Sequence, residues 1–597
     1  MNGISNGLDR EIRLKTLARF SGFWLASAGF VFMCLCLITG CSHIMRGQSP
    51  DSEAMEFNDD IDSPVYVGDV AGPIGLQKLK VDGIALVTQL DGTGSEPQPS
   101  GQRDLLIEEI KTHEIDDISS LLAGKDTSMA LVTGSVPPGA RKGDRFDVVV
   151  RCIQRSKTTS LEGGFTMQVR MKPFVAIPND ISFGHNWGVA RGHVVVDSFF
   201  DSSEDAGNKI RGLIPGGGTV TRDRICGIQI VNSERSIRRA TAISRAINKR
   251  FSARIQGRPE GVADPKNDER IEVEIAEGYQ TNVGRYFHVL FNIVFEETDE
   301  QLVNRMERLE RDLHNPEKTS IASIRLEAIG EDARNILNRG LRSDDFAVQF
   351  HSAQALAYMG DNSGVGILKK AADEEPAFRW HALTALASVK DSVSEDALAS
   401  LFSSDSAEAR YGAFRALRDS IPESLAVDGE LVGREFMLHT VVSDSKPMIH
   451  LSRTKVPEVV LFGGNQHFNE ELLYFKSGLT VKADGASRIV IKRYLPNGKE
   501  QQVVCSTLIS DVIRQMVKVG AGYGDVIRLL KDAGQTNAMD SNLVINAVPQ
   551  LSNSYRNARA ELSDKYVSEK IPEMFDDSSS DESETSKSGK GIFRDLW

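Results

Sequence analysis

A repeating pattern of leucines in the middle of the chain limits its fold more than any other feature. Leu326, Leu356, Leu386 and Leu417 recur every 30 or 31 residues, within Ala-rich segments of similar sequence. This period is typical of units of two short helices, and because one unit cannot bury its apolar face alone, neighbouring units must stack. The sequence therefore predicts an all-α solenoid over residues 315–425.

The regions on either side of these repeats have a different composition. The chain has 597 residues, enough for several domains of about 100 to 200 residues each. Short β-type runs between Gly and Pro, among them "YFHVLFNIVF" at 286–295, predict an α+β region over 64–300. Helical patches are expected at 104–122 and 236–255. Strand-like runs followed by two helices predict a second α+β region over 430–550.

Residues 1–40 have the features of an export signal. Four basic residues precede an apolar run at 20–38, and two small residues stand directly before Cys41. This pattern predicts a lipoprotein signal peptide, with Cys41 as the lipid attachment site. An uncleaved transmembrane anchor is the alternative. Ser42 in place of Asp favours the outer membrane, and the polar segment 41–63 is expected to be a flexible linker.

Charge and cysteine content limit the partners. The formal net charge of −13 becomes −15 if the signal peptide is removed, which argues against nucleic acid as a partner. Cys152, Cys226 and Cys505 would then lie in a disulfide-permissive compartment, where they allow one bridge at most. The acidic, Ser-rich segment 571–597 is expected to be a disordered tail. Its last residues, "GIFRDLW", could be a partner-binding peptide or a frayed end.

The stretch "QLDGTGS" at 89–95 is the nearest approach to a chemical motif. Gly92 separates Asp91 from Thr93, so the Asp-Thr-Gly sequence of an aspartic protease is absent. Neither a P-loop, HExxH nor GxSxG occurs, and GxGxG at 520–524 is expected to be a helix-to-helix turn. We therefore predict a turn at Asp91 and Gly92, and no enzyme: no catalytic residue, metal site or cofactor.

Several blocks together resemble the flagellar P-ring protein family of the bacterial basal body. The most specific block is "LVTGSVPPGARKGDRFDVVV" at 131–150. In it, Lys142, Arg145 and Asp147 are expected to be solvated surface. The other blocks are "VDGIALVTQLDGTGS" at 81–95, "TTSLEGG" at 158–164, "LIPGGGTVTR" at 213–222, "RRATAISRAINKRF" at 238–251, "RIEVEI" at 270–275 and the segment 508–545.

This resemblance implies a structural subunit that assembles with copies of itself into a periplasmic ring around the flagellar rod. The L-ring protein and peptidoglycan are further expected contacts. The repeats at 315–425 are similar to short HEAT-like repeats and foreign to that family, so the fold class is α+β interrupted by an all-α solenoid. The alternative function is an envelope lipoprotein adaptor of P-ring-like fold that binds proteins through its repeats.

Overall fold

The computed structural model describes residues 64–549, with gaps at 114, 116, 178–179, 201–205, 256–257, 477 and 495–499. The predicted signal peptide, Cys41, the linker and the acidic tail lie outside the described residues. Within the part that is described, no helix is both long and apolar enough to span a membrane.

A seven-stranded antiparallel sheet begins the described chain. Its strands are, in spatial order, β4 (Arg145–Cys152), β3 (Ser128–Val136), β2 (Leu79–Thr88), β5 (Phe165–Met171), β8 (Gly188–His193), β10 (Arg211–Val220) and β9 (Val195–Val196). Pairing between β4 and β10 closes the sheet on itself. In β4, the buried residues Phe146, Val148 and Val150 alternate with more exposed ones, in agreement with the expected half-buried strand.

Two helices cover one face of this sheet. They are α4 (Gly101–Lys111) and α5 (Ile118–Ala123), so the single helical patch expected at 104–122 is interrupted. Leu106 and Ile110 of α4 pack with Leu86 of β2. Ser100 caps α4 by accepting a hydrogen bond from the backbone N–H of Arg103.

A second, smaller antiparallel sheet has two associated helices. One helix precedes the last two strands of this sheet in sequence, and the other follows them. Its strands are β1 (Ala71–Ile74), β11 (Cys226–Ile230), β15 (Arg270–Val273) and β14 (Ala263–Pro265), and its helices are α7 (Ile237–Arg250) and α8 (Val283–Phe291). The helix expected at 236–255 therefore ends at Arg250, because the chain turns into strand β12 (Ser252–Ile255).

Helix α8 corrects the expectation of a strand at 286–295. A short, uniformly apolar run cannot distinguish a buried strand from a buried helix by its periodicity. Here seven of the nine residues of α8 are buried, so the helix contacts other elements on most of its sides. Asn282 starts it by accepting a hydrogen bond from the backbone N–H of Arg285, at 3.0 Å.

The middle of the chain is entirely helical, and the predicted leucines lie in its core. The helices are α9 (Asp299–Leu313), α10 (Thr319–Ile329), α11 (Arg334–Gly340), α12 (Phe346–Tyr358), α13 (Val365–Glu374), α14 (Pro376–Val389), α15 (Ser392–Ser400) and α16 (Ala407–Ser420). Leu326, Leu356, Leu386 and Leu417 occupy α10, α12, α14 and α16 and have no exposed surface.

The repeat period also recurs in polar contacts between successive units. Four hydrogen-bonded pairs are each 29 residues apart: Arg339 with Glu310, Asn362 with Asp391, Arg379 with Glu408, and Ser424 with Glu395. Each unit is thereby tied to the next one along the chain, as expected of a solenoid.

The C-terminal part contains two sheets and two helices. The first sheet has, in spatial order, β16 (Gly429–Val432), β17 (Phe436–Val441), β19 (Glu458–Phe462), β18 (Met448–Leu451) and β24 (Asn542–Ile545). The second is an antiparallel sheet of β20 (Leu473–Lys476), β21 (Leu479–Ala483), β22 (Arg488–Tyr494) and β23 (Glu500–Ser506). The helices are α17 (Ile509–Lys518) and α18 (Tyr523–Gln535), and GxGxG at 520–524 forms the predicted turn between them.

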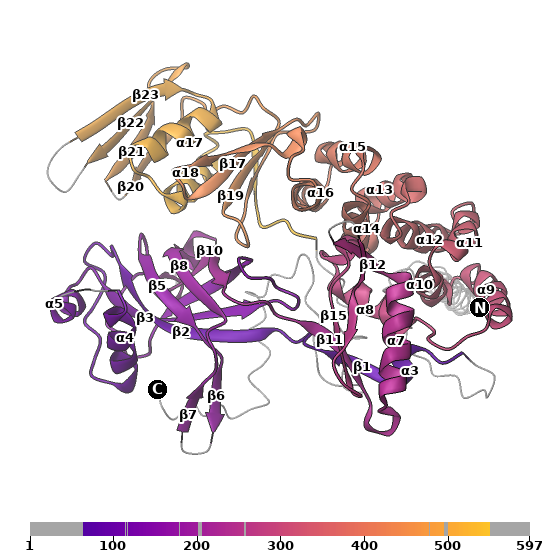
Figure 1. Ribbon diagram of the computed structural model, residues 1–597. Helices are drawn as coiled ribbons and strands as arrows, with labels where there is room; N and C mark the ends of the chain where they lie inside the picture. Colours follow the sequence, from indigo (N-terminus) through magenta and orange to yellow (C-terminus); the bar gives the residue numbers. More distant parts are fainter. Residues whose placement is uncertain are drawn as a thin grey trace, which may run out of the picture.

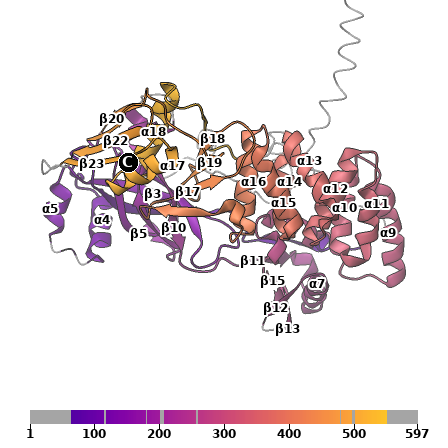
Figure 2. The same ribbon diagram turned by 90° about the horizontal axis from the view of Figure 1, so that it is seen from above.

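The two α+β regions and the solenoid between them contact one another in space. In Figure 1 the C-terminal part lies above the seven-stranded sheet, and the small sheet and the solenoid join the two on one side. Figure 2 shows the same arrangement from above. One hydrophobic core runs from the small sheet through the solenoid to β17 and β19, and a second joins the seven-stranded sheet to the C-terminal part. The predicted fold class, α+β interrupted by an all-α segment, is confirmed.

Candidate functional site

The stretch 89–95 forms the tight turn predicted from its sequence. Asp91 and Gly92 have φ angles of 45° and 79°, the two positive values that a type I′ turn requires. The N–H of Thr93 closes the turn by donating to the carbonyl of Leu90, at 3.0 Å. Gly94 lies so close to the carbonyl of Thr127 that a side chain there would meet it at 2.2 Å. The stretch therefore holds neighbouring loops together.

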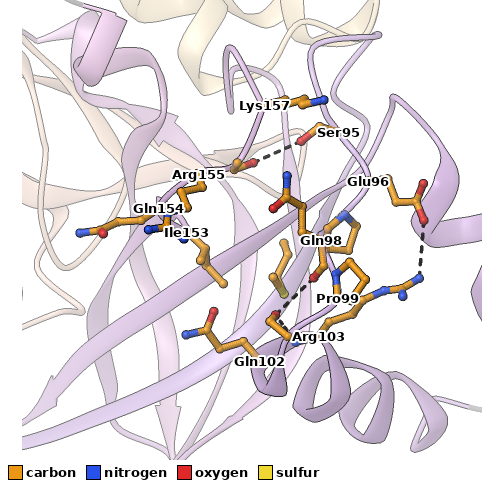
Figure 3. A pocket seen from close by; sticks show the side chains of 14 residues that line it. Ser95, Glu96, Gln98, Pro99, Gln102, Arg103, Ile153, Gln154, Arg155 and Lys157 are labelled. Atoms are coloured by element: carbon orange, nitrogen blue, oxygen red, sulfur yellow. Dashed lines mark hydrogen bonds and ion pairs between the residues drawn. The ribbon is translucent and has the colours of Figure 1, made fainter. Parts of the chain in front are cut away.

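A pocket of about 500 Å³ opens beside this turn. The Pro-rich loop that leads into α4 and residues 153–157 after β4 line it (Figure 3). Glu96 and Arg103 form an ion pair of 3.6 Å across its rim, and the Ser95 hydroxyl lies 3.2 Å from that of Ser156. None of the lining residues is a histidine, cysteine or aspartate. The hydroxyls of Ser95 and Ser156 contact each other and that of Thr158.

Asp147 joins the two α+β parts of the chain, which corrects its expected role as solvated surface. Its Oδ1 accepts hydrogen bonds from the backbone N–H of Gly216 on β10 and from that of Lys455 in the loop before β19, each 2.7 Å long. The hydrogen bond to Lys455 therefore joins Asp147 to a residue 308 positions further along the chain. Lys142 and Arg145, by contrast, are exposed as expected.

The three consecutive glycines of the segment 213–222 permit this close approach. Gly216 has a φ of 57°, and a side chain there would meet the carbonyl oxygen of Lys455 at 2.2 Å. A side chain at Gly218 would collide with the ring of Phe146, at 2.4 Å. Glycine is thus required at both positions, at one by the backbone of the C-terminal part and at the other by the core of the sheet.

Further ion pairs close the same interface. Asp197 pairs with Arg211 at 3.2 Å and, across the interface, with Arg453 at 3.1 Å. Glu162 of the "TTSLEGG" block pairs with Arg528 of α18. The Asp197 carboxylate is largely buried, so these contacts are less screened by salt than surface pairs are.

A buried glutamate also anchors each end of the solenoid. At the first end, Glu327 of α10 has no exposed surface. It accepts hydrogen bonds from the Tyr279 hydroxyl at 2.7 Å and from Arg285 Nε at 3.1 Å, and both donors belong to the segment around α8. The Tyr279 ring stacks on that of Tyr358 in α12, with centroids 4.9 Å apart. Burial and the Glu327 charge raise the pKa of Tyr279 well above its usual value, so its hydroxyl remains a donor.

At the other end the arrangement is similar, with the glutamate on the sheet rather than on the helix. Glu458 of β19 is fully buried and accepts from the Tyr411 hydroxyl of α16 at 2.7 Å and from Arg418 of the same helix. Arg418 also pairs with Asp419 at 2.8 Å. The His450 ring of β18 stacks on that of Tyr411, with centroids 3.4 Å apart. Burial, reinforced by nearby arginines, holds the pKa of His450 well below its usual value.

The three cysteines of the described residues are free thiols. Burial raises the pKa of Cys152, Cys226 and Cys505 to about 11 in each case, so near neutral pH they are protonated and weakly nucleophilic. In the part of the chain that the structure covers, no three His, Cys, Asp or Glu residues cluster as metal ligands.

Two family models match segments of this chain. Residues 67–306 match the model described as flagellar P-ring protein, and residues 335–418 match the model of HEAT repeats. Both predicted resemblances are thus confirmed. The P-ring match ends before the solenoid, so the resemblance of the segment 508–545 remains a prediction.

Curated relatives agree with the first match at low identity. The flagellar P-ring protein of Thermotoga petrophila is 29% identical over 194 residues, which are 31% of this chain and 55% of that protein. That of Pseudothermotoga lettingae is 27% identical over 228 residues, 37% of this chain and 63% of that protein. The one from Geobacter sulfurreducens is 25% identical over 268 residues, 42% of this chain and 63% of that protein. The chain thus spans a little over half the length of these relatives. It combines a region similar to flagellar P-ring proteins with a segment of HEAT repeats.

Proposed function

We propose that this protein is a structural subunit of a periplasmic ring around the flagellar rod. The observation that carries this proposal is the similarity of residues 67–306 to flagellar P-ring proteins. The expected neighbours are copies of the same chain, the rod, the L-ring protein and peptidoglycan. The P-ring family is a structural one, and the proposed subunit is accordingly not an enzyme.

Contacts inside the subunit support a role in which it must resist deformation. A subunit that keeps a rod centred must transmit force without deforming. The two α+β parts are joined through Asp147, and both ends of the solenoid are held by buried ion pairs at Glu327 and Glu458. Because each of these contacts links separate parts of the chain, opening one part strains the others.

Electron microscopy of isolated basal bodies tests this function. Basal bodies from cells with and without the gene are compared for the ring at the level of the peptidoglycan layer. Loss of that ring in the deletion is the expected result, with restoration by the wild-type gene. A ring of unchanged occupancy in the deletion would refute the proposal.

Lipid attachment at Cys41 is a separate part of the proposal. Cells labelled with radioactive palmitate should incorporate label into the wild-type chain and not into Cys41→Ser. Cys36→Ser is the matched control, because that cysteine lies in the same export signal ahead of the proposed cleavage site. Equal labelling of the wild type and Cys41→Ser would contradict the assignment. Separation of the inner and outer membranes of the labelled cells then tests whether the protein is located in the outer membrane.

The HEAT-repeat match supports a second candidate, an envelope adaptor that binds a protein partner. Solenoids of this kind present extended surfaces to other proteins. Here, α12 and α14 are largely buried against their neighbours, so the exposed side chains of α11, α13 and α15 are the ones available. Wild-type motility together with assembly into a different envelope complex would favour this candidate over the ring subunit.

A further inference from the structure

The sheet formed by β20, β21, β22 and β23 has one covered face and one open face. Its inner face, which includes Tyr474, Val481 and Ile491, is buried in the core shared with α17 and α18. Figure 1 shows both helices on the same side of this sheet. The pleat directs alternate residues to the opposite face, where no helix or strand among the described residues packs.

That outer face carries large apolar side chains in place of polar ones. Leu473 is 65% exposed, Phe475 72%, Tyr494 49% and Val504 50%. Leu473 and Val504 stand at the two ends of one cross-strand row, with Lys482 and Val490 between them. Leu473 and Phe475 lie two residues apart on this face of β20, and Val490 pairs with Val504, while Lys482 separates the two groups. Several large exposed apolar side chains on one face of a sheet are a feature of interaction sites.

Cations lie among these apolar groups. Lys482, Lys492 and Arg488 occupy outward-facing positions on β21 and β22. Lys492 pairs with Glu500 at 2.7 Å and Arg488 with Asp484 at 3.1 Å, in both cases at exposed positions. Exposed pairs are weak, so an incoming acidic segment can compete for these cations. The face therefore suits a ligand that is both apolar and acidic.

The chain itself contains such a segment. Beyond residue 549 it continues for 48 residues. Five acidic residues and no basic one lie within 576–584, and Lys587, Lys590 and Arg594 follow them. The final seven residues, "GIFRDLW", include Ile592, Phe593, Leu596 and Trp597. We propose that residues 591–597 dock on the outer face of the β20–β23 sheet, with the acidic run directed to its cations.

The length of the intervening chain allows this contact within one subunit or with a neighbouring copy. Residues 550–590 would span up to about 135 Å if fully extended and about 35 Å on average as a flexible chain. In both cases the occupant is the same segment and the recognition chemistry is the same.

Hydroxyl-radical footprinting of the purified full chain tests the proposal. The oxidation rates of Phe475 and Tyr494 are compared between the wild type and the double variant Phe593→Ser, Trp597→Ser. Phe575→Ser is the matched control, because it removes the same kind of side chain from the same tail outside the proposed segment. Leu425, which is 89% exposed on another part of the surface, serves as the internal reference.

We expect Phe475 and Tyr494 to oxidise several-fold faster in the double variant, and at the wild-type rate in Phe575→Ser. Added salt should partly release the protection, because the acidic run contributes to it. Equal rates in the wild type and the double variant would overturn the proposal. So would protection that persists in the double variant and grows with protein concentration, because the occupant would then be a sheet of a second copy. Rates that fall only when lipid vesicles are added would overturn it as well.

Discussion

Replacement of Glu458 by glutamine is the most direct test of how the solenoid is held. The side chain keeps its size, but its negative charge is lost. Glu458 is fully buried, accepts from the Tyr411 hydroxyl at 2.7 Å and is the carboxylate that pairs with Arg418 across the junction. In the variant, the amide oxygen can accept from Arg418, and the amide NH₂ can donate to the Tyr411 hydroxyl oxygen. What is lost is the negative charge that compensates the largely buried Arg418 guanidinium.

The expected free-energy cost of Glu458→Gln depends on which partners Arg418 keeps. Removing one member of a buried ion pair costs about 3 to 5 kcal/mol, because the other charge stays buried without compensation. Arg418 retains Asp419 at 2.8 Å, so the lower end of that range applies, about 3 kcal/mol. This corresponds to an increase of roughly a hundredfold in the population of the locally open state.

Hydrogen exchange of individual amides is the appropriate assay, because a chain with several joined parts need not unfold in two states. Amides of α16 and β19 should exchange roughly a hundredfold faster in Glu458→Gln. Glu430→Gln is the matched control. It is the same substitution on another strand of the same sheet, but Glu430 is 46% exposed in its pair with Arg514, so its cost should stay below about 1 kcal/mol. Equal effects of the two substitutions would refute the claim that buried charge holds this junction.

Three further predictions concern other parts of the molecule. Gly216→Ala should weaken the interface by about 1 to 3 kcal/mol, measured by hydrogen exchange of β10, because it adds a collision with the Lys455 carbonyl to the cost of a positive φ. Gly485 has a similar φ and no neighbour within 4 Å, so Gly485→Ala measures the cost of the positive φ alone. Equal losses of stability in the two variants would exclude the close approach to Lys455 as the cause. Cys226 has a pKa raised to about 11 by burial, and iodoacetamide should alkylate it about a hundredfold more slowly at pH 8 in the folded chain than in urea. His450 has a pKa held far below that of the unfolded chain, so its contribution to stability is present above about pH 6.5 and is lost as the pH falls. The free energy of local opening at β18, measured by hydrogen exchange corrected for the intrinsic exchange rate at each pH, should therefore be lower at pH 5.5 than at pH 7. The difference should be smaller in His450→Gln.

Local sequence patterns predicted the elements well wherever a local cause decides the structure. The leucine period indicated buried helices because each repeat meets only its neighbours, and Asp91 with Gly92 indicated a turn because few residues accept two positive φ angles. The run at 286–295 was misread as a strand because its neighbours, and not its period, make it a helix. The partner of Asp147 could not be found in this way, since Lys455 lies 308 residues further along the chain.

The two solenoid junctions suggest how a solenoid can be held between two α+β parts. A solenoid bound only through its two connecting peptides would move independently of the α+β parts, because loop closure alone costs little and fixes little. Here the first and the last helix of the leucine series each share a buried carboxylate cluster and an apolar core with the adjoining part. The helical segment therefore bridges the two sheets that it separates in sequence. A mutation at either glutamate should then disturb the orientation of both α+β parts, although neither residue lies on the interface that Asp147 closes.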